Sequence, residues 1–518
     1  MYRPADSPSP PPGEFKLPFE GKLSLDNRWV ILSELIPWSE FEAEYAGLFS
    51  GEIGAPAKSF RMALGALIIK EKLGISDRET VEQIKENPYL QYFIGLEEYG
   101  QKPPFDASML VHFRQRINVK LVNKVNQRVV KRRQENSSKT SQENSTEGAE
   151  ISEDKNRGKL IIDATCAPAD ITYPTDLKIL NSAREKTESI IDILHSENQN
   201  PKKKPRTYRE RARKDYLAVA KQRRPGRKVK RKAIKKQLQY IKRNLGNIEE
   251  LIAAGATLSS LNKTQYKSLL VIAEVYRQQQ WMWSNNKQSI ADRIVSITQP
   301  HIRPIVRGKA GTAVEFGAKL SATCVDGYVF LSRISWDNFN ESVDLKGQIE
   351  AYKKLVGVYP ESVHVDKIYR TRENRAWCKE RGIRMSGPPL GRPKLKVSKE
   401  ARKQALEDEK IRNEIEGKFG QAKRRFSLSR VMAKLPDTAQ TAIAIAFLVM
   451  NLSKIFRQIF WVFFGQFGAL ATCGGWRIKK SNRWVNEREK SLLFSTTSLV
   501  SSSLCSFWVT FSASPNYN

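Results

Sequence analysis

The stretch KLIIDAT (residues 159–165) decides the fold class, because it is a short apolar run that leads to an acid. Such a run is typical of a buried strand in an α/β sheet, and it predicts a functional carboxylate, Asp163, at the carboxyl-terminal tip of that strand. A second run of the same kind, SVHVDK (362–367), leads to Asp366. The sequence therefore predicts two strands of one sheet that each end on an acid.

The segments around these strands complete an α/β order. Two runs of alternating apolar and polar residues flank Asp326 and Gly327 in VEFGAKLSATCVDGYVFLSRISW (314–336). This pattern predicts a hairpin with Asp326 in its turn, so we assign Asp326 no catalytic role. From Asp163 onward the expected order is strand, helical insertion, hairpin, helix, strand, helix, short strand and long helix. The later elements are 341–357, 362–367, 371–382, 383–389 and 399–425.

Upstream of the sheet the pattern is helical from Ser59 to about Ile117, with Gly74 closing one helix and Ser76 capping the next. We expect an all-α N-terminal domain, followed by the α/β domain. The predicted divisions are a disordered lead (1–20), the helical domain (21–131), a Ser/Asn/Glu-rich linker (132–158), the α/β domain (159–455) with a basic helical insertion at about 177–300, and a C-terminal extension of uncertain structure (456–518).

Composition points to a polyanionic partner. The chain has 88 Lys and Arg against 55 Asp and Glu, a net charge of +33 over 518 residues, so nucleic acid is the first expected partner and an acidic membrane surface the second. Five scattered cysteines without a CxxC spacing predict neither a disulfide framework nor a zinc site, and they fit a reducing cytoplasm.

One apolar region raises the question of a membrane span. TAIAIAFLVMNLSKIFRQIFWVFFGQFGALA (441–471) is long enough, but Lys454 and Arg457 interrupt it. Each charge at the centre of a span costs about 2.5 to 3.5 kcal/mol on insertion scales. A pair of buried helices, without a membrane, is therefore the preferred interpretation.

Asp163 and Asp366 are the ligands that hard divalent cations prefer, because Mg²⁺ is usually held by a few carboxylates and substrate phosphate. The helix 399–425 supplies the best third carboxylate. At about 100° per residue, Arg412, Glu416 and Lys423 lie along one line about 40° wide, next to an apolar stripe that faces the sheet, whereas Glu414 lies on the opposite, solvated side. That stripe consists of Ile411, Ile415, Phe419, Ala422 and Phe426.

Such a site suits phosphoryl transfer. Two metal ions about 3.5 to 4 Å apart can activate the attacking oxygen and stabilise the leaving oxygen. Arg412 and Lys423 would add positive charge for phosphate. Water or a DNA 3′-hydroxyl can serve as the nucleophile, so hydrolysis and strand transfer can share one set of residues.

These residues also carry a family resemblance. RNEIEGKFGQAK (412–423) resembles the Y-R-E-K signature of insertion-sequence DDE transposases, with Arg412, Glu416 and Lys423 matching in identity and spacing and Glu409 standing where the family has Tyr. IIDAT (161–165) and HVDKIY (364–369) resemble the strands that bear the first and second Asp. Two further segments, 59–96 and 105–117, resemble the helical N-terminal domain of the same transposases.

The resemblance covers about residues 20–455. It implies an RNase H-like catalytic domain with Asp163, Asp366 and Glu416 as catalytic metal ligands, two Mg²⁺ or Mn²⁺ ions, and double-stranded DNA, both element ends and target, as substrate. It also implies that the helical N-terminal domain (21–131) binds DNA, that the protein acts as a homo-oligomer on paired ends, and that it is a bacterial cytoplasmic protein associated with the nucleoid.

Other interpretations stay open at this point. The chain could be a nuclease of the same fold that only hydrolyses DNA, or a non-catalytic DNA-binding remnant of a transposase. Glu416 could merely pair with Arg412 across one helical turn. The basic stretch 202–236 could be a solvated helix face, although its few acids favour phosphate contacts through residues such as Arg223, Arg224, Lys230 and Arg231.

Overall fold

The computed structural model describes residues 2, 10–18, 21–49, 56–142, 155–196, 203–309, 312–388 and 398–473. The chain divides into two compact units, Met1–Phe456 and Arg457–Asn518. The first unit contains every element discussed below except the end of the last helix.

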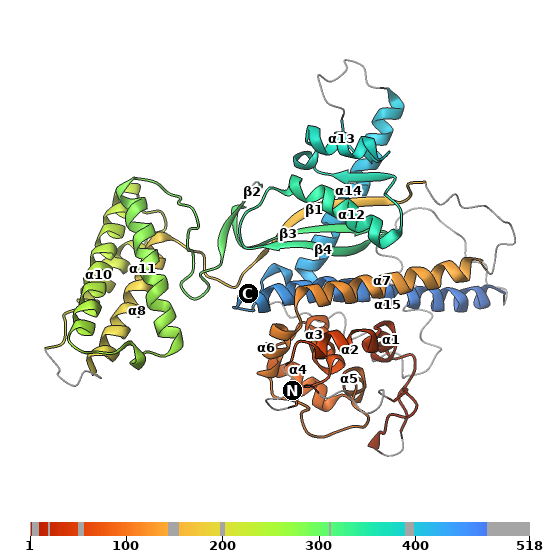
Figure 1. Ribbon diagram of the computed structural model, residues 1–518, viewed down its shortest axis with the longest axis horizontal. Coiled ribbons are helices and arrows are strands. Elements are labelled where there is room, and N and C mark those ends of the chain that lie inside the picture. Colours follow the sequence, from red (N-terminus) through yellow and green to blue (C-terminus); the bar gives the residue numbers. More distant parts are fainter. Residues whose placement is uncertain are drawn as a thin grey trace. The chain divides into compact units, whose positions relative to one another are not determined.

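In the described part of the chain, six strands form one mixed sheet in the order β2-β3-β1-β5-β6, with β4 also paired to β3. Figure 1 labels β1 to β4 of this sheet. β1 is antiparallel to β3 and parallel to β5, and β5 is parallel to β6. The mixed α/β architecture agrees with the prediction. The strands are β1 (Lys159–Pro168), β2 (Arg303–Lys309), β3 (Thr312–Val325), β4 (Tyr328–Ser335), β5 (Ser362–Val365) and β6 (Arg384–Met385).

The β3–β4 hairpin turns where the sequence predicted. Asp326 has φ 50° and Gly327 has φ 71°, so both turn residues are left-handed, as a two-residue type I′ turn requires. β2 was not expected. Its segment has only two large apolar residues, Ile305 and Val306, and it pairs only with the first half of the long strand β3, so little in its own sequence marks it as a strand.

Three helices follow the hairpin and cover the sheet: α12 (Leu345–Val356), α13 (Arg372–Glu380) and α14 (Lys399–Arg425). Ser398 caps α14 by accepting a hydrogen bond from the Ala401 N–H. α14 packs against β1 and β5. The predicted apolar stripe faces inward, since Ile415, Phe419 and Ala422 are all buried.

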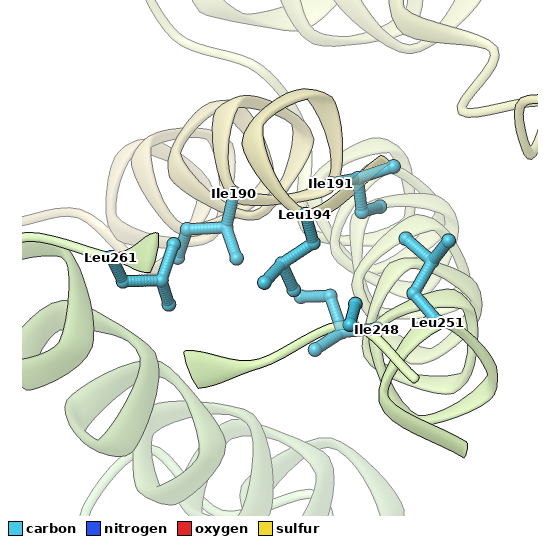
Figure 2. Close-up of a cluster of buried hydrophobic side chains, with 7 residues drawn as sticks. Ile190, Ile191, Leu194, Ile248, Leu251 and Leu261 are labelled. Carbon is cyan, nitrogen blue, oxygen red and sulfur yellow. The ribbon is translucent and has the colours of Figure 1, made fainter. Parts of the chain in front are cut away.

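The insertion between β1 and β2 is helical. It consists of α8 (Asp176–Ser196), α9 (Arg209–Ala220), α10 (Arg227–Ala253) and α11 (Lys263–Ser284). It has its own apolar core, in which Ile190, Ile191 and Leu194 of α8 meet Ile248 and Leu251 of α10 (Figure 2). The insertion is thus stabilised by contacts among its own helices.

The described residues before β1 form seven helices. Ser59 and Ser76 cap two of them with side-chain hydrogen bonds, and Gly74 ends the first of these two with φ 69°. The helices are α1 (Arg28–Leu35), α2 (Trp38–Ala46), α3 (Phe60–Leu73), α4 (Asp77–Glu86), α5 (Pro88–Phe93), α6 (Met109–Arg116) and α7 (Val119–Gln142).

Two expectations for the N-terminal region were wrong in part. Within the predicted disordered lead, Phe15 is 2% exposed and packs with Leu23, Val30 and Tyr92. Helix α7 continues to Gln142, into the predicted linker, because no Gly or Pro interrupts the polar segment 132–142. Residues 143–154 of that linker lie outside the described residues.

The apolar region near the C-terminus forms one helix, α15 (Pro436–Cys473), and not the predicted pair. Because its sequence contains neither Pro nor Gly between Asp437 and Phe464, nothing ends the helix there. Among the described residues, Pro436–Phe460 is the one segment long and apolar enough to cross a membrane, and 72% of its most apolar window is buried inside the protein. The rest of the predicted C-terminal extension, from residue 474, lies outside the described residues.

Candidate active site

The register of β1 and β5 places two acids side by side. The parallel pairing ends with Ile162 opposite Val365, and the next residues along the two strands are Asp163 and Asp366. Asp163 is not at the tip of its strand, as the sequence suggested, but in its middle. β1 continues to Pro168 because it pairs with β3 over its whole second half, whereas β5 stops at Val365.

α14 brings the predicted third carboxylate to the same place. Glu416, Arg412 and Lys423 line one cleft of about 940 Å³ together with Asp163 and Asp366. Glu414 is exposed, as expected, and its Oε1 lies beside Gly327 at the β3–β4 turn. The structure thus separates the two glutamates of this helical turn.

Arg412 is shared between two acids of its own helix. Its guanidinium lies 2.6 Å from Glu409 and 3.2 Å from Glu416. The Glu416 side chain is 56% exposed. Lys423 lies farther along the helix, with its Nζ 3.9 Å from Glu315. The basic residues of the predicted line therefore border the cleft, and Arg412 holds the Glu416 carboxylate at its edge.

Asp163 is in an unfavourable place for an isolated charge. Burial, followed by the nearby carboxylates of Glu341 and Asp366, raises the pKa of Asp163 to about 6, while the Ala164 N–H (2.8 Å) and Arg412 act in the opposite direction. A divalent cation would offset this accumulation of negative charge. The chemistry of these side chains fits a hard metal ion with oxygen ligands.

In the described residues, no group of three or more Asp, Glu, His or Cys side chains lies close enough together to hold a metal ion as arranged. The three predicted carboxylates share a cleft but do not converge on one point. His364 lies buried in β5, with its Nε2 3.1 Å from Ser362 Oγ.

The sequence interpretation missed two residues of the cleft, Lys319 and Glu341. Lys319 is 8% exposed on β3, where its Nζ donates to the Phe339 carbonyl (2.7 Å) and pairs with Glu341 (2.9 Å). Glu341 begins the short 3₁₀ helix η3 (Glu341–Asp344). The available signal was a lysine between Ala318 and Leu320 in a strand that is otherwise apolar at this point.

Arg370 supports the end of β5 from the other side. It donates to the carbonyl of Val365, the residue before Asp366, at 2.7 Å. Its guanidinium passes so close to Gly387 (φ 98°) that a Cβ there would overlap it. Glycine at this position therefore leaves space for Arg370, which holds the backbone just before Asp366.

Comparison with known proteins addresses the same regions. Residues 363–453, which include Asp366 and Glu416, match the family described as Transposase DDE domain, and residues 17–116 match Transposase domain (DUF772). Two segments of the chain are therefore similar to transposase domains. The first runs from β5 into α15, and the second contains the six described helices before α7.

A segment of 88 residues is 38% identical to the "Uncharacterized protein ORF8 in nfe locus" of Rhizobium meliloti. It makes up 17% of this chain and 42% of that protein, so the chain spans less than half the length of this curated relative. No solved structure matches the chain.

Proposed function

We propose that this protein is the DNA transposase of an insertion sequence, which binds terminal inverted repeats and catalyses metal-dependent DNA cleavage and strand transfer on an RNase H-like domain. One observation supports this most directly. The segment that matches the DDE domain contains Asp366 and Glu416, and the β1–β5 register sets Asp163 beside Asp366 in the cleft that Glu416 borders.

In this proposal Asp163, Asp366 and Glu416 would hold two Mg²⁺ or Mn²⁺ ions. When bound, the ions supply an activated attacking oxygen and stabilise the leaving oxygen of the phosphoryl transfer. The Arg412 guanidinium can donate two hydrogen bonds to one phosphate. When DNA binds, Arg412 would release one of its two glutamates and bond a DNA phosphate in its place. Lys423 contributes a point charge farther along the cleft.

Sequence-independent affinity for DNA would come from the insertion. Arg227, Lys230 and Arg231 line a small cavity of about 280 Å³ with two further cations, Lys287 and Arg293. Arg227 and Arg231 both donate to the side-chain oxygen of Asn286, each at 3.2 Å. A neutral amide thus holds two guanidinium groups near each other, where a backbone phosphate can accept from both. Arg223 and Arg224 are exposed just before α10.

The remaining parts of the proposal follow from the family resemblance. The N-terminal helices would read the element ends, the protein would act as a homo-oligomer on paired ends, and it would work at the bacterial nucleoid. DNA cleavage and joining can be tested separately from these parts.

The test uses the full chain, a labelled duplex that carries the inverted repeat flanking the coding region, a target plasmid, and Mg²⁺ or Mn²⁺. The proposal predicts cleavage at the repeat end and covalent joining of that end to the plasmid. Cleavage without joined product would instead identify the protein as a hydrolytic nuclease. DNA binding without cleavage in either metal would identify it as a non-catalytic remnant of a transposase.

A further inference from the structure

We propose that Glu341 is a further carboxylate of this metal site, binding the divalent ion together with Asp163 and Asp366, and that Lys319 occupies it when the ion is absent. This inference rests on the proposed function. It adds a ligand from the wall of the cleft formed by η3, which the family signature on α14 does not contain.

Position and burial favour Glu341. It lines the same cleft as Asp163 and Asp366. Its side chain is 18% exposed, against 56% for Glu416, which Arg412 holds at the edge. Burying a carboxylate is costly unless it is paired with a cation.

Lys319 is the cation that Glu341 contacts in this structure, at 2.9 Å. The same Nζ also donates to the Phe339 carbonyl (2.7 Å) and to Asn338 Oδ1 (3.0 Å). These two bonds hold the lysine and the chain before η3 independently of Glu341. The glutamate can therefore exchange Lys319 for a metal ion without loss of the local backbone structure.

Tyr369, a fully buried residue of η4 (Lys367–Tyr369), lies near Glu341 and Asp163. Ser321, which accepts from Gln348 (2.8 Å), is near the Tyr369 hydroxyl, but among the described residues no partner lies within hydrogen-bond distance of that hydroxyl.

A buried hydroxyl without a hydrogen bond, near several carboxylates, is costly in the absence of a ligand. A hydrated divalent ion between the carboxylates would neutralise their charge, and its water could bond the hydroxyl. The cleft with its half-buried Glu341, the exchangeable Lys319 and the nearby Tyr369 hydroxyl thus point to the same place.

The first experiment titrates Mn²⁺ into the full chain without DNA, by calorimetry. We expect Glu341→Gln to weaken Mn²⁺ binding about tenfold or more, since mutating even an outer-shell partner of a metal typically lowers metal affinity by that much. Glu350→Gln is the matched control, because Glu350 is exposed on the adjoining helix α12. Lys319→Gln should bind Mn²⁺ as well as the wild type or better, since it removes the competing charge.

The outcomes are separable. If Asp163→Asn weakens Mn²⁺ binding and Glu341→Gln does not, Glu341 is not a ligand and the proposed function stands. If neither substitution has an effect, the metal site itself is wrong. Equal losses in Glu341→Gln and Lys319→Gln would mean that the ion pair serves structure only, which would also overturn the inference.

A second measurement avoids substitutions, so it remains decisive if Glu341→Gln does not fold. Fe²⁺ bound to the wild-type protein, with ascorbate and peroxide, cleaves the backbone next to the ion. The inference predicts cuts near residues 163, 366 and 341. Cuts near 163 and 366 with none near 341 would contradict it.

Discussion

At the scale of single residues, Glu409 stands where the Y-R-E-K signature that this helix resembles has Tyr, and it changes the environment of Arg412. Glu409 and Glu416 compete for Arg412, at 2.6 and 3.2 Å. Glu409→Tyr should release Arg412 toward Glu416 and phosphate, so DNA cleavage should be preserved or raised. Stability should change little, because an exposed pair contributes about 0.2 to 1 kcal/mol. Loss of cleavage in a variant with unchanged thermal unfolding would show that Glu409 has a role of its own.

Gly387 offers a second test at this scale. Gly387→Ala should displace Arg370 and lower the cleavage rate, because a Cβ would overlap the guanidinium that holds Val365. Gly357→Ala is a matched control, since Gly357 has φ 94° and open space around its Cβ position. Both variants should lose about 1 to 2 kcal/mol of stability from a left-handed alanine. Equal cleavage rates in the two variants would exclude a positioning role for Arg370.

At the scale of elements, the sequence was sufficient to predict those helices and turns that a local pattern determines. The bounds of α14 and the β3–β4 turn follow from a cap, an apolar stripe and an Asp-Gly pair. Three features depended on pairing with distant residues and were not predictable. Asp163 lies within β1 because of β3, β2 is a strand because β3 extends past its hairpin, and Glu341 meets Lys319 only in the folded sheet.

The insertion carries the next prediction. Replacing Arg223, Arg224, Lys230 and Arg231 by Gln should flatten the slope of log affinity against log salt by up to about three to four units, at about 0.9 per lost phosphate contact. Affinity should fall equally on specific and random duplexes, since phosphate contacts do not specify sequence.

The control uses the other end of the same helical body. Lys230→Gln with Arg231→Gln is compared with Lys263→Gln with Lys267→Gln, both exposed at the start of α11. The cavity lies by the end of that helix, about 25 to 30 Å away at 1.5 Å per residue. Equal slopes for the two double variants would mean that the residues of the cavity do not contact DNA and are only solvated. A loss of affinity for the specific end alone would mean that the insertion contacts bases.

At the scale of the whole molecule, Glu71 connects the N-terminal helices to the α/β part of the chain. Its carboxylate, 5% exposed on α3, accepts from the Ser427 N–H (2.7 Å) and hydroxyl (2.9 Å) just after α14. Burial raises the pKa of Glu71, so the folded state favours the protonated form. This residue's contribution to stability therefore falls as pH rises above the ordinary glutamate value of about 4.3.

Glu71→Gln should consequently unfold at a higher denaturant concentration than the wild type at pH 7, and the difference should shrink toward pH 5. The amide can accept from the Ser427 N–H and donate to its hydroxyl, so both bonds survive. Glu71→Leu should lose about 1 to 3 kcal/mol, the cost of an unsatisfied buried donor. A glutamine variant less stable than the wild type at pH 7 would indicate that the charge itself is required.

We propose that Asp163, Asp366 and Glu416 form one catalytic centre for cutting and joining DNA. The most direct measurement compares DNA cleavage and end binding for Asp163→Asn, Asp366→Asn and Glu416→Gln, in Mg²⁺ and in Mn²⁺, with Glu414→Gln as the control. We predict that the three variants bind the element end like the wild type but neither cleave nor join it, whereas the control remains active. Retained cleavage in any of the three would contradict the assignment.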